Sequence, residues 1–327
     1  MSEAKEYSLG PLPWNKEMLH KAYFSNLVST TEAIKEHPGY EVESDLFDLR
    51  FALEIFLDSV ADLLLSIADF GKECRIPGFW HRGNKNRVVH FERRVRHGVS
   101  TASMSLFSLV DVSRRVSRHY KIEGYEENVK STFAENGQHR FIQCLRNYIT
   151  HVRLAESGWH ITWARKGTVQ TQFLLKTEDL LSWKGWDKLA LSFISRYPKG
   201  IDLKLLFESY AESVGTFQQW FIMEIEKSQE DQLAEYRSYD KLLKSFAWKS
   251  FWELMLGQVV IRNGIDPYQH LDKHLTPDEI AEVLAMPKYS RQQVDRIIEI
   301  VDEKGLVDEE LRDLAYRAFK VQPGGED

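Results

Sequence analysis

The sequence has few of the features that mark secreted, membrane-spanning or nucleotide-driven proteins. Its 327 residues include two cysteines, Cys74 and Cys144, which form no CxxC pair. We therefore expect a reducing, cytoplasmic compartment and no thiolate metal site. The first 13 residues contain no apolar signal-peptide core. The most apolar stretch, 47–70, is interrupted by six charged residues and predicts an amphipathic or buried helix rather than a membrane span. No Walker A loop, GxGxxG turn or GxSxG elbow is present, which argues against a motor, a dehydrogenase or a serine hydrolase.

The charge is unevenly distributed. Hydrophobic residues make up 43 % and charged residues 28 % of the chain, as in globular proteins. The net charge is −6, yet residues 72–121 hold 12 Lys or Arg and three acids, a balance of +9 that leaves −15 for the rest. A basic block of this kind favours a polyanion partner such as RNA, whereas the alternative is a helix face that pairs with acidic segments. The arginines we expect to contact RNA are Arg87, Arg93, Arg94, Arg96, Arg114, Arg115 and Arg118.

Hydrophobic periodicity predicts a mainly α protein, in which a helical bundle carries an inserted β-hairpin and a small C-terminal helical unit. Helices are expected at 14–37, 44–70 (capped by Ser44), 91–119, 125–135 and 138–155, with a basic loop at 72–90. The predicted segments are an N-terminal lead-in (1–43), the bundle (44–157), the hairpin (158–176), a second helical region (177–268), the small unit (269–320) and a flexible tail (321–327).

Two local patterns define the ends of these segments. Residues 159–164 and 168–173 alternate with period two on either side of Lys166-Gly167, which predicts a hairpin that packs on the bundle. Thr276-Pro277-Asp278-Glu279 is a capping box with proline at the first helical position, and helices at 290–304 and 308–319 are expected to follow.

The motif that most strongly suggests a catalytic or binding site is Arg-Asn-Tyr-Ile-Thr-His, at residues 146–151. Its helix should bury one apolar face, made of Phe141, Ile142, Leu145, Tyr148 and Ile149. On that helix Asn147 and His151 are i,i+4 neighbours, and Arg146 lies on the adjacent flank. An arginine can hold a phosphate, a histidine can exchange a proton near neutral pH, and an asparagine can orient either. The alternative is a structural Arg and His that satisfy buried polar groups.

This motif resembles the R-(N/D/H)-x3-H form found in HEPN domains, over residues 45–155. The resemblance implies a small helical bundle that acts as a metal-independent endoribonuclease without a cofactor, in bacterial toxin–antitoxin or antiphage systems. It also implies a homodimer or higher oligomer with two motifs in one active site, and an antitoxin or companion defence protein as a further partner. His151 would act as general base or acid, Arg146 would stabilise charge on phosphorus, and Asn147 would orient His151 or the phosphate.

Two rival hypotheses remain open. In the first, the chain is a non-catalytic helical module that binds RNA or a protein within a defence or regulatory complex. In the second, the segment 278–307, which resembles a helix-turn-helix core, reads DNA. Residues 276–320 hold seven bases and 11 acids, a poor balance for phosphate contacts, so we expect a protein-interaction role there.

Two other groups of residues suggest chemistry, but both have simpler explanations. The aromatics of the second helical region could stack bases, although packing is the more typical use; they are Trp220, Phe221, Trp248, Phe251 and Trp252. His270 and His274 have metal-ligand spacing without a third ligand, and we interpret them as surface histidines.

Overall fold

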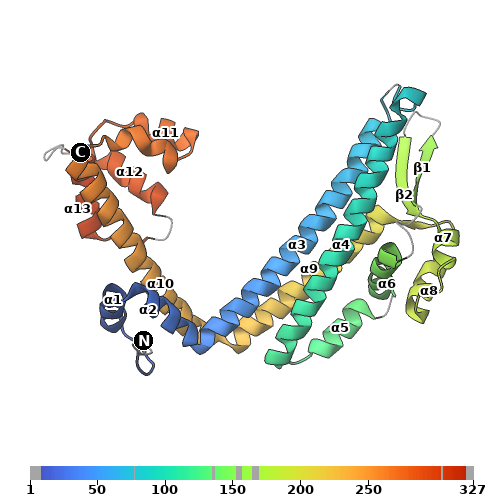
Figure 1. Ribbon diagram of the computed structural model, residues 1–327, viewed down its shortest axis with the longest axis horizontal. Coiled ribbons are helices and arrows are strands. Elements are labelled where there is room, and N and C mark those ends of the chain that lie inside the picture. The colour runs from blue at the N-terminus through green and yellow to red at the C-terminus, as the bar shows by residue number, and fades with distance from the viewer. Residues whose placement is uncertain are drawn as a thin grey trace, which may run out of the picture. The chain divides into compact units, whose positions relative to one another are not determined.

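The computed structural model describes residues 9–76, 78–134, 137–151, 157–163, 169–302 and 305–321. It is mainly α with a β-hairpin, which confirms the predicted fold class (Figure 1). The chain forms two compact units. Unit 2 covers residues 41–233, and unit 1 takes the described residues of 1–40 and 234–327. The six consecutive segments expected from the sequence stay a prediction. In the structure, residues from both ends of the chain belong to the same compact unit, unit 1.

Three long helices form the framework of unit 2 and run side by side in Figure 1: α3 (Pro38–Glu73), α4 (Lys85–His119) and α9 (Leu203–Ser228). The other elements of this unit are η2 (Arg82–Asn84), α5 (Tyr125–Phe133), α6 (Gln138–His151), β1 (Ser157–Trp163), β2 (Val169–Leu175), α7 (Thr177–Leu181), α8 (Lys188–Ser195) and β3 (Ile201–Asp202). A continuous apolar core joins α3, α4, α6, β2, α8 and α9.

Two predicted boundaries were wrong. The long helix begins at Pro38 rather than at Ser44, because proline suits the first helical position, where no N–H is needed. The predicted basic loop at 72–90 is shorter than expected, since α4 already begins at Lys85. Arg87, in the first turn of α4, forms an ion pair with Glu73 at the end of α3 (2.5 Å). The start of α4 therefore lies against the end of α3.

The predicted hairpin is confirmed, with β1 and β2 antiparallel and Trp159 paired with Phe173. Its turn, which includes Lys166 and Gly167, lies outside the described residues. The two-residue strand β3 adds to β2 at Leu174 and Leu175. Phe173 and Leu175 are buried in the unit 2 core, so the hairpin packs on the helices as expected.

Unit 1 contains α1 (Lys16–Ser25), α2 (Leu27–Ala33), η1 (Ile34–Glu36), α10 (Glu230–Glu253), the π-helix η3 (Leu254–Ile261), η4 (Pro267–Lys273), α11 (Pro277–Leu284), α12 (Arg291–Val301) and α13 (Glu309–Ala318). The capping box at Thr276 is confirmed, with Glu279 bonded back to the Thr276 N–H. The expected helices at 290–304 and 308–319 appear as α12 and α13. Residues 322–327 of the predicted tail lie outside the described range.

Candidate functional site

Helix α6 carries the motif, and its packing follows the predicted apolar face. Phe141, Ile142, Leu145 and Tyr148 are buried, while Ile149 is partly buried. The aromatic members stack on side chains that follow or belong to α7 and α8: Phe141 lies 5.3 Å from Trp186, with nearly parallel rings. This packing fixes the rotation of α6, because the apolar face can point only toward the core.

Arg146 emerges beside that face and turns toward α4. Its guanidinium carbon lies 4.4 Å from the centre of the Phe107 ring, a cation–π arrangement, and the side chain is half-buried. A guanidinium that lies over a ring face has its plane fixed by that contact. Asn147 is exposed. The backbone of His151 ends α6 four residues after Asn147, and the His151 side chain lies outside the described part of the chain.

The first turn of α6 is bonded to α9, which the sequence did not indicate. The Gln138 side-chain amide donates to the Leu206 carbonyl (3.0 Å) and to the Ser209 hydroxyl (2.9 Å). His139 Nδ1 lies 2.5 Å from the Tyr210 hydroxyl. Burial lowers the pKa of His139 to about 4, and the charges of Arg140 and Arg114 contribute, so this imidazole is neutral at pH 7. Burial also raises the pKa of Tyr210, which stays protonated.

His139, Gln143 and Arg146 follow one another at i, i+4 and i+7, so they share one side of α6, with Asn147 on its flank. We call these four residues the polar stripe. His139 and Arg146 are separated by about 10 Å along the helix axis, at 1.5 Å per residue. The motif is therefore the C-terminal part of a longer row of polar side chains.

A cavity of about 430 Å³ opens at the N-terminal end of the polar stripe, between α4, α5 and α6. Three basic side chains and one acid, Glu126, are among the residues that line it; the basic ones are Arg114, Lys130 and Arg140. Arg140 is partly neutralised by Asp187, whose carboxylate lies 2.6 Å away. The cavity can therefore attract an anion. His139 gave no sequence signal, because its partner Tyr210 is 71 residues away.

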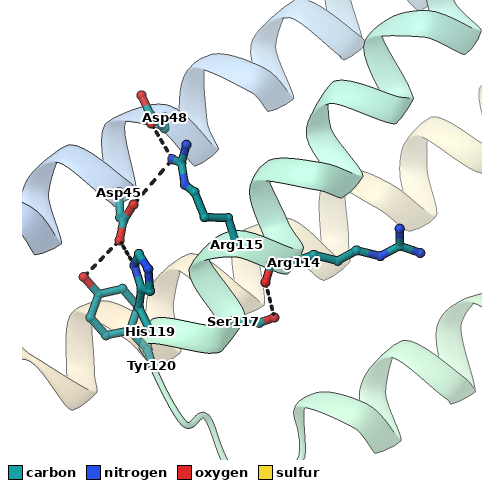
Figure 2. A network of polar contacts seen from close by, with 7 residues as sticks. All are labelled: Asp45, Asp48, Arg114, Arg115, Ser117, His119 and Tyr120. Carbon is teal, nitrogen blue, oxygen red and sulfur yellow. Dashed lines mark hydrogen bonds and ion pairs between the residues drawn. The ribbon is translucent and has the colours of Figure 1, made fainter.

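The predicted basic block is divided among different surroundings. Three of its arginines form ion pairs with acids of α3: Arg87 with Glu73, Arg94 with Asp69 (3.3 Å), and Arg115 with Asp48 (2.5 Å). Figure 2 shows Arg114 and Arg115 pointing to opposite sides of α4, so that Arg114 faces away from α3.

The other arginines of the block do not join this pairing. Arg114 has a long contact with Asp111 of its own helix, at 3.9 Å. Among the described residues, Arg93, Arg96 and Arg118 have no ion pair with an acid. The block therefore serves in part as the α3–α4 interface, and RNA contact by its members stays a prediction.

Asp45 is the most buried carboxylate of that interface (Figure 2). It accepts a hydrogen bond from the Tyr120 hydroxyl (3.2 Å) and lies 2.8 Å from His119 Nδ1. Arg115 reaches its other oxygen at 3.4 Å. Burial, followed by the charge of Asp45, raises the pKa of Tyr120. All of these groups are bound to one another, which is typical of a structural clasp between two helices.

Comparison with known proteins gives no relative. The chain matches no protein-family model, no curated protein and no solved structure. Within the described residues, no three His, Cys, Asp or Glu side chains come together as a set that could hold a metal ion. No helix in the described ranges is both long enough and apolar enough to cross a bilayer.

Proposed function

We propose that this protein binds RNA along the polar stripe of α6 and cleaves it as a metal-independent endoribonuclease. The observation that carries the proposal is the position of Arg146, whose guanidinium is held over the Phe107 ring beside the exposed Asn147. A pre-oriented guanidinium can bind two phosphate oxygens while losing little side-chain entropy. The resemblance of the motif to HEPN nucleases supports the choice of RNA, and a role in bacterial defence or toxicity rests on that resemblance alone.

In the proposed reaction, the ribose 2′-hydroxyl attacks the adjacent phosphorus as its proton passes to His151. The bond from phosphorus to the 5′-oxygen breaks, and that oxygen receives a proton from a second acid. The products are a 2′,3′-cyclic phosphate and a free 5′-hydroxyl. Arg146 would stabilise the charge that develops on the non-bridging oxygens, and Asn147 would orient the phosphate or His151. We propose that the motif of a second protomer supplies the acid.

The basic cavity at the start of α6 supports the proposal that RNA lies along this side of the helix. Arg114, Lys130 and Arg140 would hold a neighbouring phosphate about two helical turns from Arg146, on the same side of α6. His139 is neutral at pH 7 and bonded to Tyr210, so we assign it the positioning of α6 rather than proton transfer.

A second candidate is a non-catalytic module that binds RNA or a protein. The observation that favours it is the pairing of Arg87, Arg94 and Arg115 with α3, which gives these arginines a structural role. In this case Arg146 would also be structural, fixing α6 to α4 through Phe107.

One experiment separates the two candidates. The purified chain is incubated with total RNA and with tRNA in EDTA, alongside Arg146→Ala, His151→Ala and the control Arg262→Ala. Arg262 is an exposed arginine of unit 1, and its side chain bonds to Gln258 of its own segment. Under the nuclease hypothesis, wild type and the control leave cyclic-phosphate ends, and each motif variant loses about 100-fold or more in rate. Cleavage by all four proteins would refute this site. RNA binding without cleavage by wild type would favour the second candidate.

A further inference from the structure

The C-terminal part of unit 1 encloses an apolar cavity of about 310 Å³. Its walls come from α10, the π-helix η3, η4, α12 and α13. Trp252, Val260, Leu271, Ile297 and Leu311 represent these five elements in order. The volume is at the lower end of the range for small-molecule sites, and twice that of cavities that hold benzene.

The surrounding core does not close on itself. Val283 and Val294 are fully buried, but other apolar side chains of the same cluster stay only partly buried, among them Trp248, Trp252 and Val260. Aliphatic side chains that line an open cavity lose packing partners and remain exposed to water, so an apolar occupant would stabilise the unit.

The backbone is unusual at the same place. Residues 254–261 form a π-helix of eight residues, and Met255, Leu256, Val259 and Val260 from it line the cavity. π-Helical turns are rare and occur frequently at functional sites. Here the wider turn places two adjacent pairs of apolar side chains on the cavity wall.

Basic side chains border the cavity. Among the described residues that line it, three are basic, His270, Lys273 and His274, and none is acidic. All three are exposed, and His274 also packs against the ring of Trp252, 5.3 Å between centroids. This is notable because residues 276–320 carry more acids than bases. An apolar interior with a basic rim is complementary to a ligand whose alkyl chain ends in an anionic group.

We propose that this cavity binds a free aliphatic carboxylate of medium chain length. The alkyl chain of the ligand would fill the space between η3, α12 and α13. Its carboxylate would lie at the rim beside Lys273, His270 and His274. Aliphatic rather than planar ligands are expected because the walls are mainly Leu, Ile and Val. The inference is independent of the RNA site, since it concerns residues of unit 1 alone.

The test measures binding of three probes to the full chain by calorimetry, below their micelle concentrations: decanoate, 1-decanol and decyltrimethylammonium. We expect decanoate to bind one per chain, about tenfold more tightly than decanol, with the cation weakest. Decanoate should also raise the Tm of the transition of unit 1, since it binds the folded state. Equal affinity for decanoate and decanol would overturn the carboxylate assignment, and binding of none would overturn the site.

Three variants locate the site. Lys273→Met changes an exposed rim residue and should weaken decanoate binding about fivefold without affecting decanol. The matched control is Lys241→Met, an exposed lysine of α10 outside the cavity lining, which should bind as wild type does. Ala315→Leu adds side-chain volume inside the cavity and should abolish binding of both probes. Equal effects of the two lysine variants on decanoate binding would overturn the placement of the carboxylate at this rim. Binding to anionic phosphatidylglycerol vesicles without binding of decanoate would identify a membrane surface instead and overturn the proposal.

Discussion

The hydroxyl of Tyr210 lies 2.5 Å from Nδ1 of His139, joining α9 to the first turn of the motif helix. The two rings are also stacked, with planes inclined by 30° and centroids 6.0 Å apart. This contact and the two bonds of Gln138 to α9 fix the N-terminal end of α6, while Phe107 and Arg146 fix its later part against α4. The position of the motif is therefore set at two separate points of the helix.

The buried His139 predicts a pH-dependent stability. Its pKa falls from 6.5 to about 4 on folding, so the unfolded chain binds more protons between these values. The resulting stability is fully present above pH 6.5 and is lost as pH falls toward 4, by about 3 kcal/mol. The measurement is urea denaturation at pH 7 and pH 4. Between these pH values the unfolding free energy of wild type should fall by about 3 kcal/mol more than that of His139→Gln.

Tyr210→Phe serves as the control for that experiment. It removes the hydrogen bond but leaves the burial that chiefly lowers the pKa of His139. The pH dependence should therefore persist in this variant, although its stability at pH 7 falls. Parallel pH curves for wild type and His139→Gln would contradict the assignment to His139.

Phe107 should act on RNA cleavage as a positioning residue, through Arg146. Phe107→Leu keeps an apolar side chain on α4 but removes the ring face below the guanidinium. We expect kcat to fall about fivefold, in line with a cation–π contribution of about 1 kcal/mol, while the fold is retained. The measurement is single-turnover cleavage of tRNA, with Phe251→Leu, an exposed aromatic of unit 1, as control. An unchanged rate in Phe107→Leu would argue against this role.

Gly98 lies at a close contact between α4 and α3. A Cβ there would lie 3.1 Å from the Cα and Cβ of Leu63, so the neighbouring helix would have to shift by a few tenths of an ångström to accommodate a side chain. Gly98→Val should destabilise unit 2 by about 1–3 kcal/mol in urea denaturation. Gly215→Ala on α9, where a Cβ meets nothing within 4 Å, should instead stabilise it by up to about 1 kcal/mol. A neutral Gly98→Val would show that the helices can separate freely.

Two neighbouring aspartates of α3 should differ in their effect on stability. Asp45 is buried and bound to His119, Tyr120 and Arg115, so Asp45→Asn should cost about 1–3 kcal/mol of unfolding free energy. Asp48 is only partly buried and pairs with Arg115, and Asp48→Asn should cost less than about 1 kcal/mol. Equal losses in thermal or urea denaturation would contradict the clasp at Asp45.

Periodicity alone predicted most elements, because helix and strand burial repeat along the chain with fixed spacing. The apolar face of α6, the hairpin around residues 159–173 and the capping box at Thr276 are local patterns, and all appear in the structure. The start of α3 was missed because Ser44 offered a plausible cap, although Pro38 begins the helix six residues earlier.

By itself, the sequence determined the mainly α class, the orientation of α6 and the position of Arg146 beside its buried face. Only the tertiary structure decided which polar and charged groups meet. Three arginines of the basic block face carboxylates of α3, and His139 meets Tyr210, because helices far apart in sequence pack side by side. The apolar cavity behind His270 and Lys273 is likewise a product of packing, since its walls come from five elements whose spacing along the chain carries no common pattern.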